Sequence, residues 1–372
     1  MNIPPFTLER FFARHEFTAK YLLCSSDCEP LSMEELLGWA DVEMKAKWSD
    51  LKLGYTESPG NPILRQEISG LYRHIQAGQV LVVTPEEGIF IAMNTILRPG
   101  DHAICTFPGY QSLYEVARSG GVSVSFWEPR WEAGWRFHTS DLKHLLQKNT
   151  RAIIVNFPHN PTGATVSMEE FSEIAGLAKS RNIILLSDEM YRFLEHDSRV
   201  PLPAACDLYE NAVSLSGLSK SFALAGLRIG WLAVRNEVLY REFASFKDYT
   251  TICNSAPSEI LAIIGLRNKA KILQRNSEII RTNLQILDDF FGKYPEVFSW
   301  YRPQAGTVAF PAMQGVRTSS EFCKSALAGT GVLLLPSGEF GFGESHFRIG
   351  YARLNMREAL GALENHIVGM EQ

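Results

Sequence analysis

The chain has 372 residues, of which 45% are hydrophobic and 21% charged, and its formal net charge is −5. These values are typical of a folded globular protein with one large or two modest domains. Charged residues of both signs are mixed along the sequence, and no apolar run approaches the about 20 residues of a membrane span. We therefore expect neither nucleic acid nor a membrane as a partner.

The cysteines and the first residues favour the cytoplasm. The opening ten residues lack the basic and then apolar pattern of a secretory signal. Six cysteines are scattered along the chain, and Cys24 and Cys28 have no second pair with which to form a zinc site. Free thiols, no metal and a cytoplasmic location are the expectation.

Residues 1–50 have helical character, interrupted at Ser25, and are rich in phenylalanine and tyrosine. We interpret them as an N-terminal arm that packs on a small domain or on a partner subunit.

From about residue 55 onward, short apolar strands alternate with helices. The expected strands are 80–83, 103–105, 122–126, 152–156, 183–186, 212–215 and 229–234. The expected helices are 62–72, 84–97, 111–119, 142–147, 168–180, 236–247, 256–266 and 270–291. This alternation predicts an α/β fold, a three-layer αβα domain with a mostly parallel mixed sheet.

The last part of the chain predicts a smaller C-terminal α+β domain. Its expected strands lie near 306–311, 331–334 and 346–351, and two helices accompany them. The expected division is an arm over 1–50, a large ligand-binding domain over 51–285 and a small domain over 286–372.

Polar segments follow four of the predicted strands, at the edge where parallel sheets bind ligands. These are Thr84–Gly88, Asn156–Gly163, Asp188 with Tyr191, and Lys220.

Together these segments offer the functional groups that pyridoxal 5'-phosphate requires. Lys220 supplies an amine for an imine, and Asp188 supplies a carboxylate for the ring nitrogen. Tyr191 and Asn160 suit a phenolate oxygen, and Arg228 suits a phosphate. Taken singly, each residue is more often explained by a turn, an exposed charge or an ion pair. Their order and their shared position at strand ends favour the cofactor.

Three motifs carry a family resemblance. They are Asn-Phe-Pro-His-Asn-Pro-Thr-Gly at 156–163, Ser-Asp-Glu-Met-Tyr at 187–191, and Leu-Ser-Lys at 218–220 followed by Arg-Ile-Gly-Trp at 228–231. With them the chain resembles the class I and II aminotransferases, which are fold type I pyridoxal-phosphate enzymes. Residues 55–62 and 248–251 look most like aminotransferase-like proteins near the capreomycidine synthases.

The resemblance implies a role for each central residue. Lys220 would form the internal aldimine and move the proton between Cα and the C4' carbon of the cofactor. Asp188 would keep the pyridine nitrogen protonated. Tyr191 and Asn160 would hydrogen-bond the 3'-oxygen.

The remaining implied roles concern the ring, the phosphate and the substrate. Tyr110 would stack on the ring face, although core packing is its alternative. Arg228 would hold the phosphate, with Tyr55 reaching in from the other subunit of a homodimer. Arg348, with Asn160 beside it, would bind the substrate α-carboxylate; its alternative is a solvent-facing position on an edge strand.

Two departures from the family affect the phosphate site. Pro85 has no N–H to donate, but Thr84 and Glu87 form a capping-box pattern. We expect the Glu86 and Glu87 amides to face the phosphate, with the Glu87 side chain turned back to its cap. The Glu86 side chain should point away or pair with a cation.

The second departure is Gly217, where many relatives carry a hydroxyl. Ser216 or Ser219 is the expected substitute for that phosphate ligand.

The function implied is amino transfer between an amino acid and a 2-oxo acid. The first alternative is a lyase or cyclase acting by β-elimination, as in the capreomycidine synthases. A non-catalytic cofactor-binding protein would be expected to lose Lys220 or Asp188, and both are present. A DNA-binding regulator is disfavoured because no basic patch is visible, and Gly341-Phe-Gly343 lacks the third glycine of a dinucleotide fingerprint. No second arginine is marked for a substrate side-chain carboxylate.

Overall fold

The computed structural model describes residues 2–196, 200–315 and 317–370, and within them it confirms the predicted fold class. A seven-stranded sheet has the order β1-β7-β6-β5-β4-β2-β3. Its strands are β1 Val80–Val83, β2 His102–Thr106, β3 Ser123–Trp127, β4 Thr150–Asn156, β5 Ile184–Asp188, β6 Ala212–Gly217 and β7 Gly230–Val234. Only β7 runs antiparallel to its neighbours β1 and β6, so among the described strands the sheet is mostly parallel but mixed.

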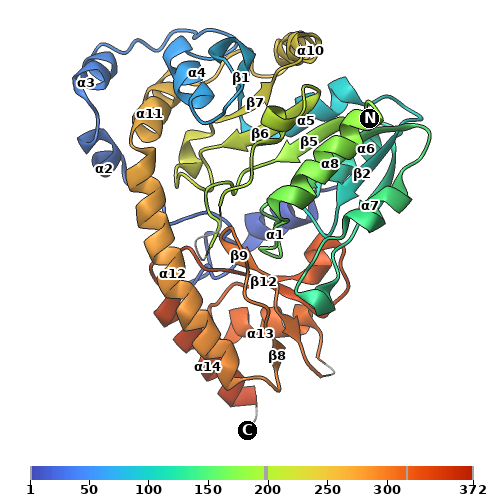
Figure 1. The fold of residues 1–372 in the computed structure, drawn as a ribbon. Coiled ribbons are helices and arrows are strands. Elements are labelled where there is room, and N and C mark those ends of the chain that lie inside the picture. Colours follow the sequence, from blue (N-terminus) through green and yellow to red (C-terminus); the bar gives the residue numbers. More distant parts are fainter. Residues whose placement is uncertain (1, 197–199, 316, 371–372) are drawn as a thin grey trace.

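Helices cover both faces of this sheet (Figure 1). The α-helices up to the long connector are α1 Thr7–His15, α2 Met33–Gly38, α3 Val42–Ser49, α4 Pro62–Ser69, α5 Pro85–Ile96, α6 Ser112–Ser119, α7 Thr139–Leu145, α8 Met168–Ser180, α9 Ala205–Leu208, α10 Glu237–Lys247, α11 Ala256–Arg267 and α12 Lys269–Lys293. Short 3-10 helices are η1 Ala77–Gln79, η2 Trp131–Ala133, η3 Ala225–Leu227 and η4 Ser337–Phe340. The predicted helix at 168–180 is found with its bounds unchanged, whereas the one predicted at 142–147 begins three residues earlier.

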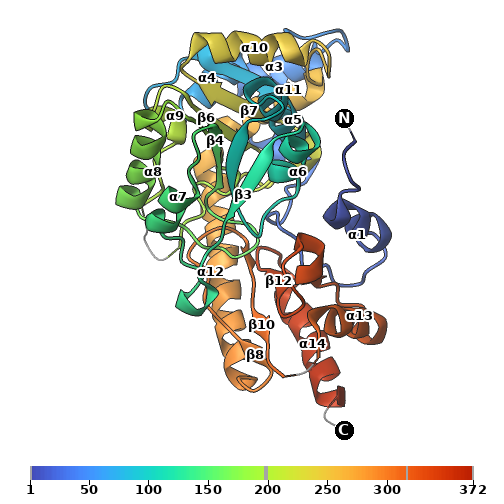
Figure 2. The same cartoon turned by 90° about the vertical axis from the view of Figure 1, so that its right-hand side faces the viewer.

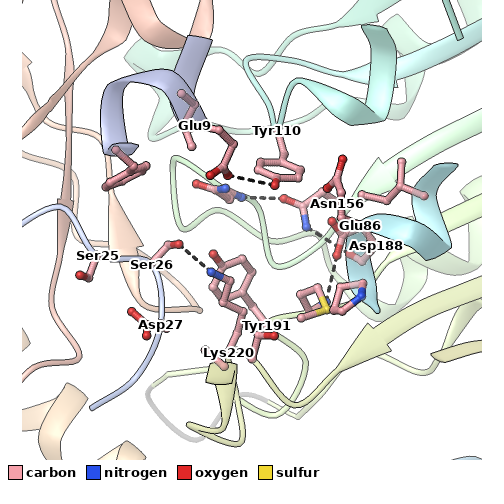
Figure 3. Close-up of a pocket in the computed structure, with 18 of the residues that line it drawn as sticks. Glu9, Ser25, Ser26, Asp27, Glu86, Tyr110, Asn156, Asp188, Tyr191 and Lys220 are labelled. Carbon is pink, nitrogen blue, oxygen red and sulfur yellow. Dashed lines mark hydrogen bonds between the residues drawn. The ribbon is translucent and has the colours of Figure 1, made fainter. Parts of the chain in front are cut away.

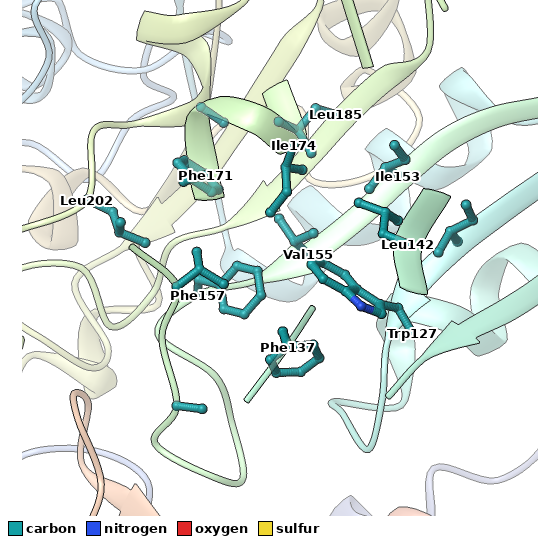
Figure 4. Packing of buried hydrophobic residues seen from close by; sticks show 14 of the residues in the cluster. Trp127, Phe137, Leu142, Ile153, Val155, Phe157, Phe171, Ile174, Leu185 and Leu202 are labelled. Atoms are coloured by element: carbon teal, nitrogen blue, oxygen red, sulfur yellow. The ribbon is translucent and has the colours of Figure 1, made fainter. Parts of the chain in front are cut away.

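Successive side chains of the central strands point to opposite faces of the sheet, so they belong to two separate parts of the hydrophobic core. Ile153 and Val155 of β4 pack with Phe171 and Ile174 of α8 in one cluster (Figure 4). The intervening Ile154 belongs to the cluster on the opposite face, which includes residues of α5 and α6. Burial on both faces explains why these strands are apolar throughout.

The smaller C-terminal part lies below the large sheet in the view of Figure 1. Helix α12 extends from α11 into this C-terminal part (Figures 1 and 2). Its elements are β8 Phe298–Ser299, β9 Val308–Ala309, β10 Ala312–Met313, α13 Ser319–Thr330, β11 Leu335–Pro336, β12 Phe347–Gly350 and α14 Met356–Met370. The strands form two small antiparallel sheets, β11-β12-β9 and β10-β8.

The strand predicted near 331–334 is wrong in position, because β11 begins at Leu335. Val332 instead makes an isolated parallel bridge with Tyr21 of the N-terminal segment. The apolar run is buried, and the Leu333 amide donates to the Tyr21 carbonyl at 2.9 Å, so the run pairs with a segment far away in the sequence.

The N-terminal segment lies against the C-terminal part, and Ser26 of this segment reaches Lys220 in the loop after β6. The Gly350 amide donates to the Leu23 carbonyl at 2.8 Å, and Leu23 belongs to the core cluster around α12 and α14. A Cβ on Gly350 would meet the Ser25 carbonyl oxygen at 1.9 Å, so only glycine permits this approach. The domain boundaries at 50 and 285 stay a prediction.

No helix in the described part of the chain combines the length and the apolar character that crossing a bilayer requires.

Candidate active site

One cavity of about 370 Å³ opens at the carboxyl ends of β4, β5 and β6. Its size is within the range of pockets for small ligands and cofactors. Nine of the predicted site residues line it: Glu86, Tyr110, Asn160, Asp188, Tyr191, Ser219, Lys220, Arg228 and Arg348. Figure 3 labels Glu86, Tyr110, Asp188, Tyr191 and Lys220 among them. Two do not. Glu87 lines a neighbouring apolar pocket, and Tyr55 lies on the surface with 93% of it exposed.

Lys220 follows β6 and projects into the cavity, where its Nζ donates a hydrogen bond to Ser26 Oγ at 2.8 Å. Figure 3 shows this bond between the N-terminal segment and the strand-end loop. Ser26 is a site residue that the sequence did not indicate, because a single serine in a loop is ordinary turn chemistry.

Asp188 ends β5 and is 6% exposed. Burial raises the pKa of its carboxyl to about 7, and the hydrogen bond from the Met190 amide and the charge of Lys220 only partly offset that effect. A carboxylate held in this way is stabilised by a cationic group placed next to it, such as a protonated ring nitrogen.

A chain of hydrogen bonds joins Asp188 to Arg348. Asn156 Nδ2 donates to the Asp188 carbonyl at 3.1 Å, and Asn156 Oδ1 accepts from the Asn160 amide at 2.8 Å. Asn160 Oδ1 in turn accepts from Arg348 Nη1 at 3.1 Å. The asparagines therefore fix the geometry between the two ends of the site.

Arg348 is 1% exposed, so the solvent-facing alternative is wrong. Its guanidinium donates to the Cys24 carbonyl and to Asn160, and burial lowers its pKa. Within the described residues it has no carboxylate partner. A buried cation without a counter-ion is a ready receptor for a carboxylate.

Two buried hydroxyls in the cavity lack a hydrogen-bond partner among the described residues. They are Tyr191 Oη and Ser219 Oγ. Ser216, the other candidate for the missing hydroxyl, donates to the Glu189 carbonyl and does not line the cavity. Unsatisfied buried donors call for a polar ligand, and the cofactor's phenolate and phosphate oxygens suit them.

The two departures in the phosphate region form one packing arrangement. A Cβ on Gly217 would lie 3.0 Å from Gly230 Cα and 3.2 Å from Pro85 Cγ. A Cβ on Gly230 would meet the same proline ring at 2.9 Å. The backbone at Ile229 and Gly230 and the Pro85 ring together occupy the space that a side chain at 217 would need, so a glycine at 217 fits beside Pro85.

The capping box at Thr84 is present, with Glu87 Oε2 accepting from the Thr84 amide at 3.1 Å. Glu87 also accepts from Thr250 and Thr251. Its side chain is therefore turned away from the cavity, as its capping role requires.

The expectation for the Glu86 side chain is wrong. It neither points away nor forms an ion pair within the described chain, but lines the cavity. Burial raises the pKa of this carboxyl, and the hydroxyls of Ser112 and Tyr110 and the charge of Arg228 act in the opposite direction. Position N2 of α5 directs the side chain toward Tyr110, where burial favours the neutral acid.

Tyr110 both lines the cavity, as its predicted role at the cofactor ring requires, and packs against another aromatic ring, as its core-packing alternative requires. Its ring packs against Phe6, with centroids 4.9 Å apart, and it also lines the cavity. Its hydroxyl donates to Glu9 Oε1 at 3.2 Å (Figure 3). Arg228 is exposed at the cavity, with a left-handed backbone (φ 55°) and a hydrogen bond from Nη1 to the Ala225 carbonyl.

The N-terminal segment contributes three acidic residues that were not predicted, namely Glu9, Glu16 and Asp27. Asp27 pairs with Arg353 at 2.8 Å. In the sequence these residues lie in the arm with no motif around them, so only the tertiary fold brings them to the site.

The fold and the cavity are those of a pyridoxal-phosphate enzyme, and comparison with known proteins establishes the family. The profile of the aminotransferases of class I and II matches residues 19–365, and the chain belongs to this family. Its members are pyridoxal-phosphate-dependent transferases, so the predicted enzyme class and cofactor are confirmed.

Individual relatives point to more than one reaction. Capreomycidine synthase from Streptomyces vinaceus is 28% identical over 98% of this chain and 94% of its own. A pyridoxal-phosphate-dependent aminotransferase from Streptococcus suis has a TM-score of 0.93 and 28% identity, with both chains fully covered. The pyridoxal-phosphate-dependent cyclase OrfR has a TM-score of 0.89 and 26% identity, covering 100% of this chain and 98% of its own.

Proposed function

We propose that this protein transfers an amino group from an amino acid to a 2-oxo acid at the cavity around Lys220. The observation that carries the proposal is that Lys220, Asp188 and Arg348 line the same cavity, and that Arg348 has no carboxylate partner among the described residues. An amine, a carboxylate for a ring nitrogen and a receptor for an α-carboxylate are the groups that amino transfer needs.

When bound, pyridoxal phosphate supplies an electron sink for the bonds at the substrate Cα. The residues of the chain would orient the substrate and move its proton. Arg348 would hold the α-carboxylate, and Asn160 would fix the guanidinium that holds it. The Lys220 amine would take the proton from Cα and return it, and Asp188 would keep the ring nitrogen protonated.

The cofactor contacts follow from the same geometry. Tyr191 and Asn160 would bind the phenolate oxygen, and Tyr110 would cover the ring. Arg228, Ser219 and the amides of Glu86 and Glu87 would hold the phosphate at the start of α5.

A cyclase or lyase is the second candidate. Capreomycidine synthase and the cyclase OrfR both match this chain over nearly the full length of each protein. Elimination needs the same Cα proton transfer, so the site residues themselves support either reaction.

A panel of amino acids mixed with the purified holoenzyme distinguishes the two reactions. Conversion of the cofactor to its amine form, with release of a 2-oxo acid, supports amino transfer. Release of ammonia while the cofactor keeps its aldehyde form supports elimination. The Lys220→Ala variant is the control, and it should do neither.

We also propose a cytoplasmic homodimer in which Tyr55 completes the site of the other subunit. Tyr55 is exposed here and lies outside its own cavity. Leu53, two residues away, and Tyr249, which follows the Asp248 that contacts Ser58, are similarly exposed. Exposed apolar side chains gathered in this way favour an interface.

A further inference from the structure

Most of the acidic residues that line the cavity have no role in the proposed function. Its three cations are Lys220, Arg228 and Arg348, and all have proposed roles with the cofactor or the α-carboxylate. Of its acidic residues, Asp188 is assigned to the ring nitrogen. Those that remain are Glu9, Glu16, Asp27 and Glu86.

Three of these acids come from one segment and converge on one side of the cavity. Asp27 lies across Lys220 from Asp188, and Glu9 lies above the Lys220 amine, beside Tyr110 (Figure 3). Glu16 lies close enough to both that their charges raise its pKa, in addition to the effect of its own burial. The negative charges of Glu9 and Asp27 act on Arg348 and oppose the lowering of its pKa by burial. Both residues therefore lie near the place proposed for the substrate carboxylate.

Two of the three carboxylates lack a counter-ion. Asp27 is paired with Arg353, but neither Glu9 nor Glu16 has an ion-pair partner in the described part of the chain. Carboxylates that repel one another at a partly buried site are stabilised by a cation between them.

A separate observation indicates that the cavity bordered by these acids binds a ligand. The buried Tyr191 hydroxyl, which is 3% exposed, lines the same cavity and has no partner among the described residues. The buried Arg348 guanidinium lines the cavity too, and no carboxylate in the described part of the chain pairs with it. The acidic residues therefore border a binding site and are not merely an exposed patch.

We propose that the substrate of this enzyme is a basic amino acid, whose side-chain ammonium or guanidinium group binds between Glu9 and Glu16. This inference rests on the part of the proposed function that places an amino acid beside Lys220. The α-carboxylate binds Arg348, and the side chain extends toward the N-terminal segment. An acidic side chain is disfavoured there, because within the described residues no further cation lines that side.

Unreactive ligands test the charge preference separately from the reaction. α-Methyl amino acids lack the Cα hydrogen, so they bind the holoenzyme without being turned over, and binding shifts the cofactor's absorption. α-Methylornithine and α-methylnorvaline share the α-amine, the α-carboxylate and the carbon chain, and differ in the side-chain ammonium. α-Methylglutamate supplies the opposite charge.

We expect α-methylornithine to bind at least about tenfold more tightly than α-methylnorvaline, with α-methylglutamate weakest. Glu9→Gln and Glu16→Gln should each reduce this ratio of Kd values several-fold. Binding of α-methylnorvaline serves as the internal measure of an intact site. Glu9→Gln keeps an acceptor for the Tyr110 hydroxyl. Glu173→Gln on the remote helix α8 removes the same charge and should leave the ratio unchanged.

Equal binding of the ornithine and norvaline analogues, tighter binding of the glutamate analogue, or no binding of the ornithine analogue would overturn the proposal. So would a ratio that Glu9→Gln and Glu16→Gln leave intact. If the preference holds but no amino acid undergoes amino transfer, the proposed reaction fails while the substrate class stands.

Discussion

Lys220 Nζ and Ser26 Oγ lie 2.8 Å apart, although 194 positions separate the two residues in the chain. This hydrogen bond joins the loop after β6 to the N-terminal segment, which is itself held against β12 by the Gly350–Leu23 bond. The orientation of the reactive amine thus depends on packing between the two ends of the chain. Ser26 is a positioning residue for Lys220 in this arrangement.

Ser26→Ala should lower kcat by up to about tenfold and change KM little. A neutral hydrogen bond contributes about 0.5–1.5 kcal/mol, and its loss leaves the Lys220 amine free to adopt other rotamers. Steady-state kinetics measures the effect, and Ser26→Thr, which keeps the hydroxyl, should recover part of it. An equal loss in the threonine and alanine variants would show that the hydroxyl does not position the lysine.

Lys220→Ala should remove covalent attachment of the cofactor and lower activity by at least about 10³-fold, because the same amine both binds the cofactor and moves the proton. Borohydride reduction followed by mass spectrometry measures the attachment. Lys143→Ala, which removes a surface amine of α7, should still be labelled at Lys220. Labelling of the Lys220→Ala variant at another position would identify a different anchor.

Asp188 gives the cofactor-free protein a specific dependence of stability on pH. Its folded pKa of about 7 lies above the ordinary value of 3.8, so the folded state binds more protons than the unfolded state between these pH values. The free energy of unfolding therefore contains a contribution that is complete below about pH 4 and is lost as the pH rises to about 7.

Asp188→Asn removes that contribution, so the variant's apoprotein should lose less stability than wild type between pH 4 and 7. Each unit of pKa shift corresponds to about 1.4 kcal/mol. Urea unfolding at a series of pH values measures the difference between the two proteins. Glu195 and Glu259, whose pKa values burial also raises to about 7, are present in both and cancel in the comparison. Parallel pH profiles for the two proteins would contradict the expectation.

The sequence could predict those site residues that directly follow a recognisable strand, and it could not predict those that only tertiary contacts bring to the cavity. The sequence predicts the apolar strands that precede Lys220, Asp188 and Asn160. Because the carboxyl ends of parallel strands lie at the same edge of a sheet, these residues could be placed together. Glu9 and Ser26 reach the same cavity through contacts between distant segments, which leave no periodic signal. The Glu86 side chain was placed wrongly because it lies in the cavity beside Tyr110, and this arrangement depends on packing between α5 and the segment before α6.

The exposed position of Tyr55 allows the proposed shared active site to be tested by mixing impaired subunits. Lys220→Ala and Tyr55→Ala subunits are each expected to give impaired homodimers. In a mixed dimer, one site would carry both defects if Tyr55 acts across the interface, and the other site would have an intact Lys220 and an intact Tyr55. Random mixing of equal amounts makes about half of the dimers hybrids, each with one good site of two, so activity should recover to about a quarter of wild type.

Co-expression with two affinity tags allows the hybrid to be purified and assayed directly. If Tyr55 instead serves its own chain, each site of the hybrid carries one defect. The hybrid then shows no more activity than the average of the two homodimers.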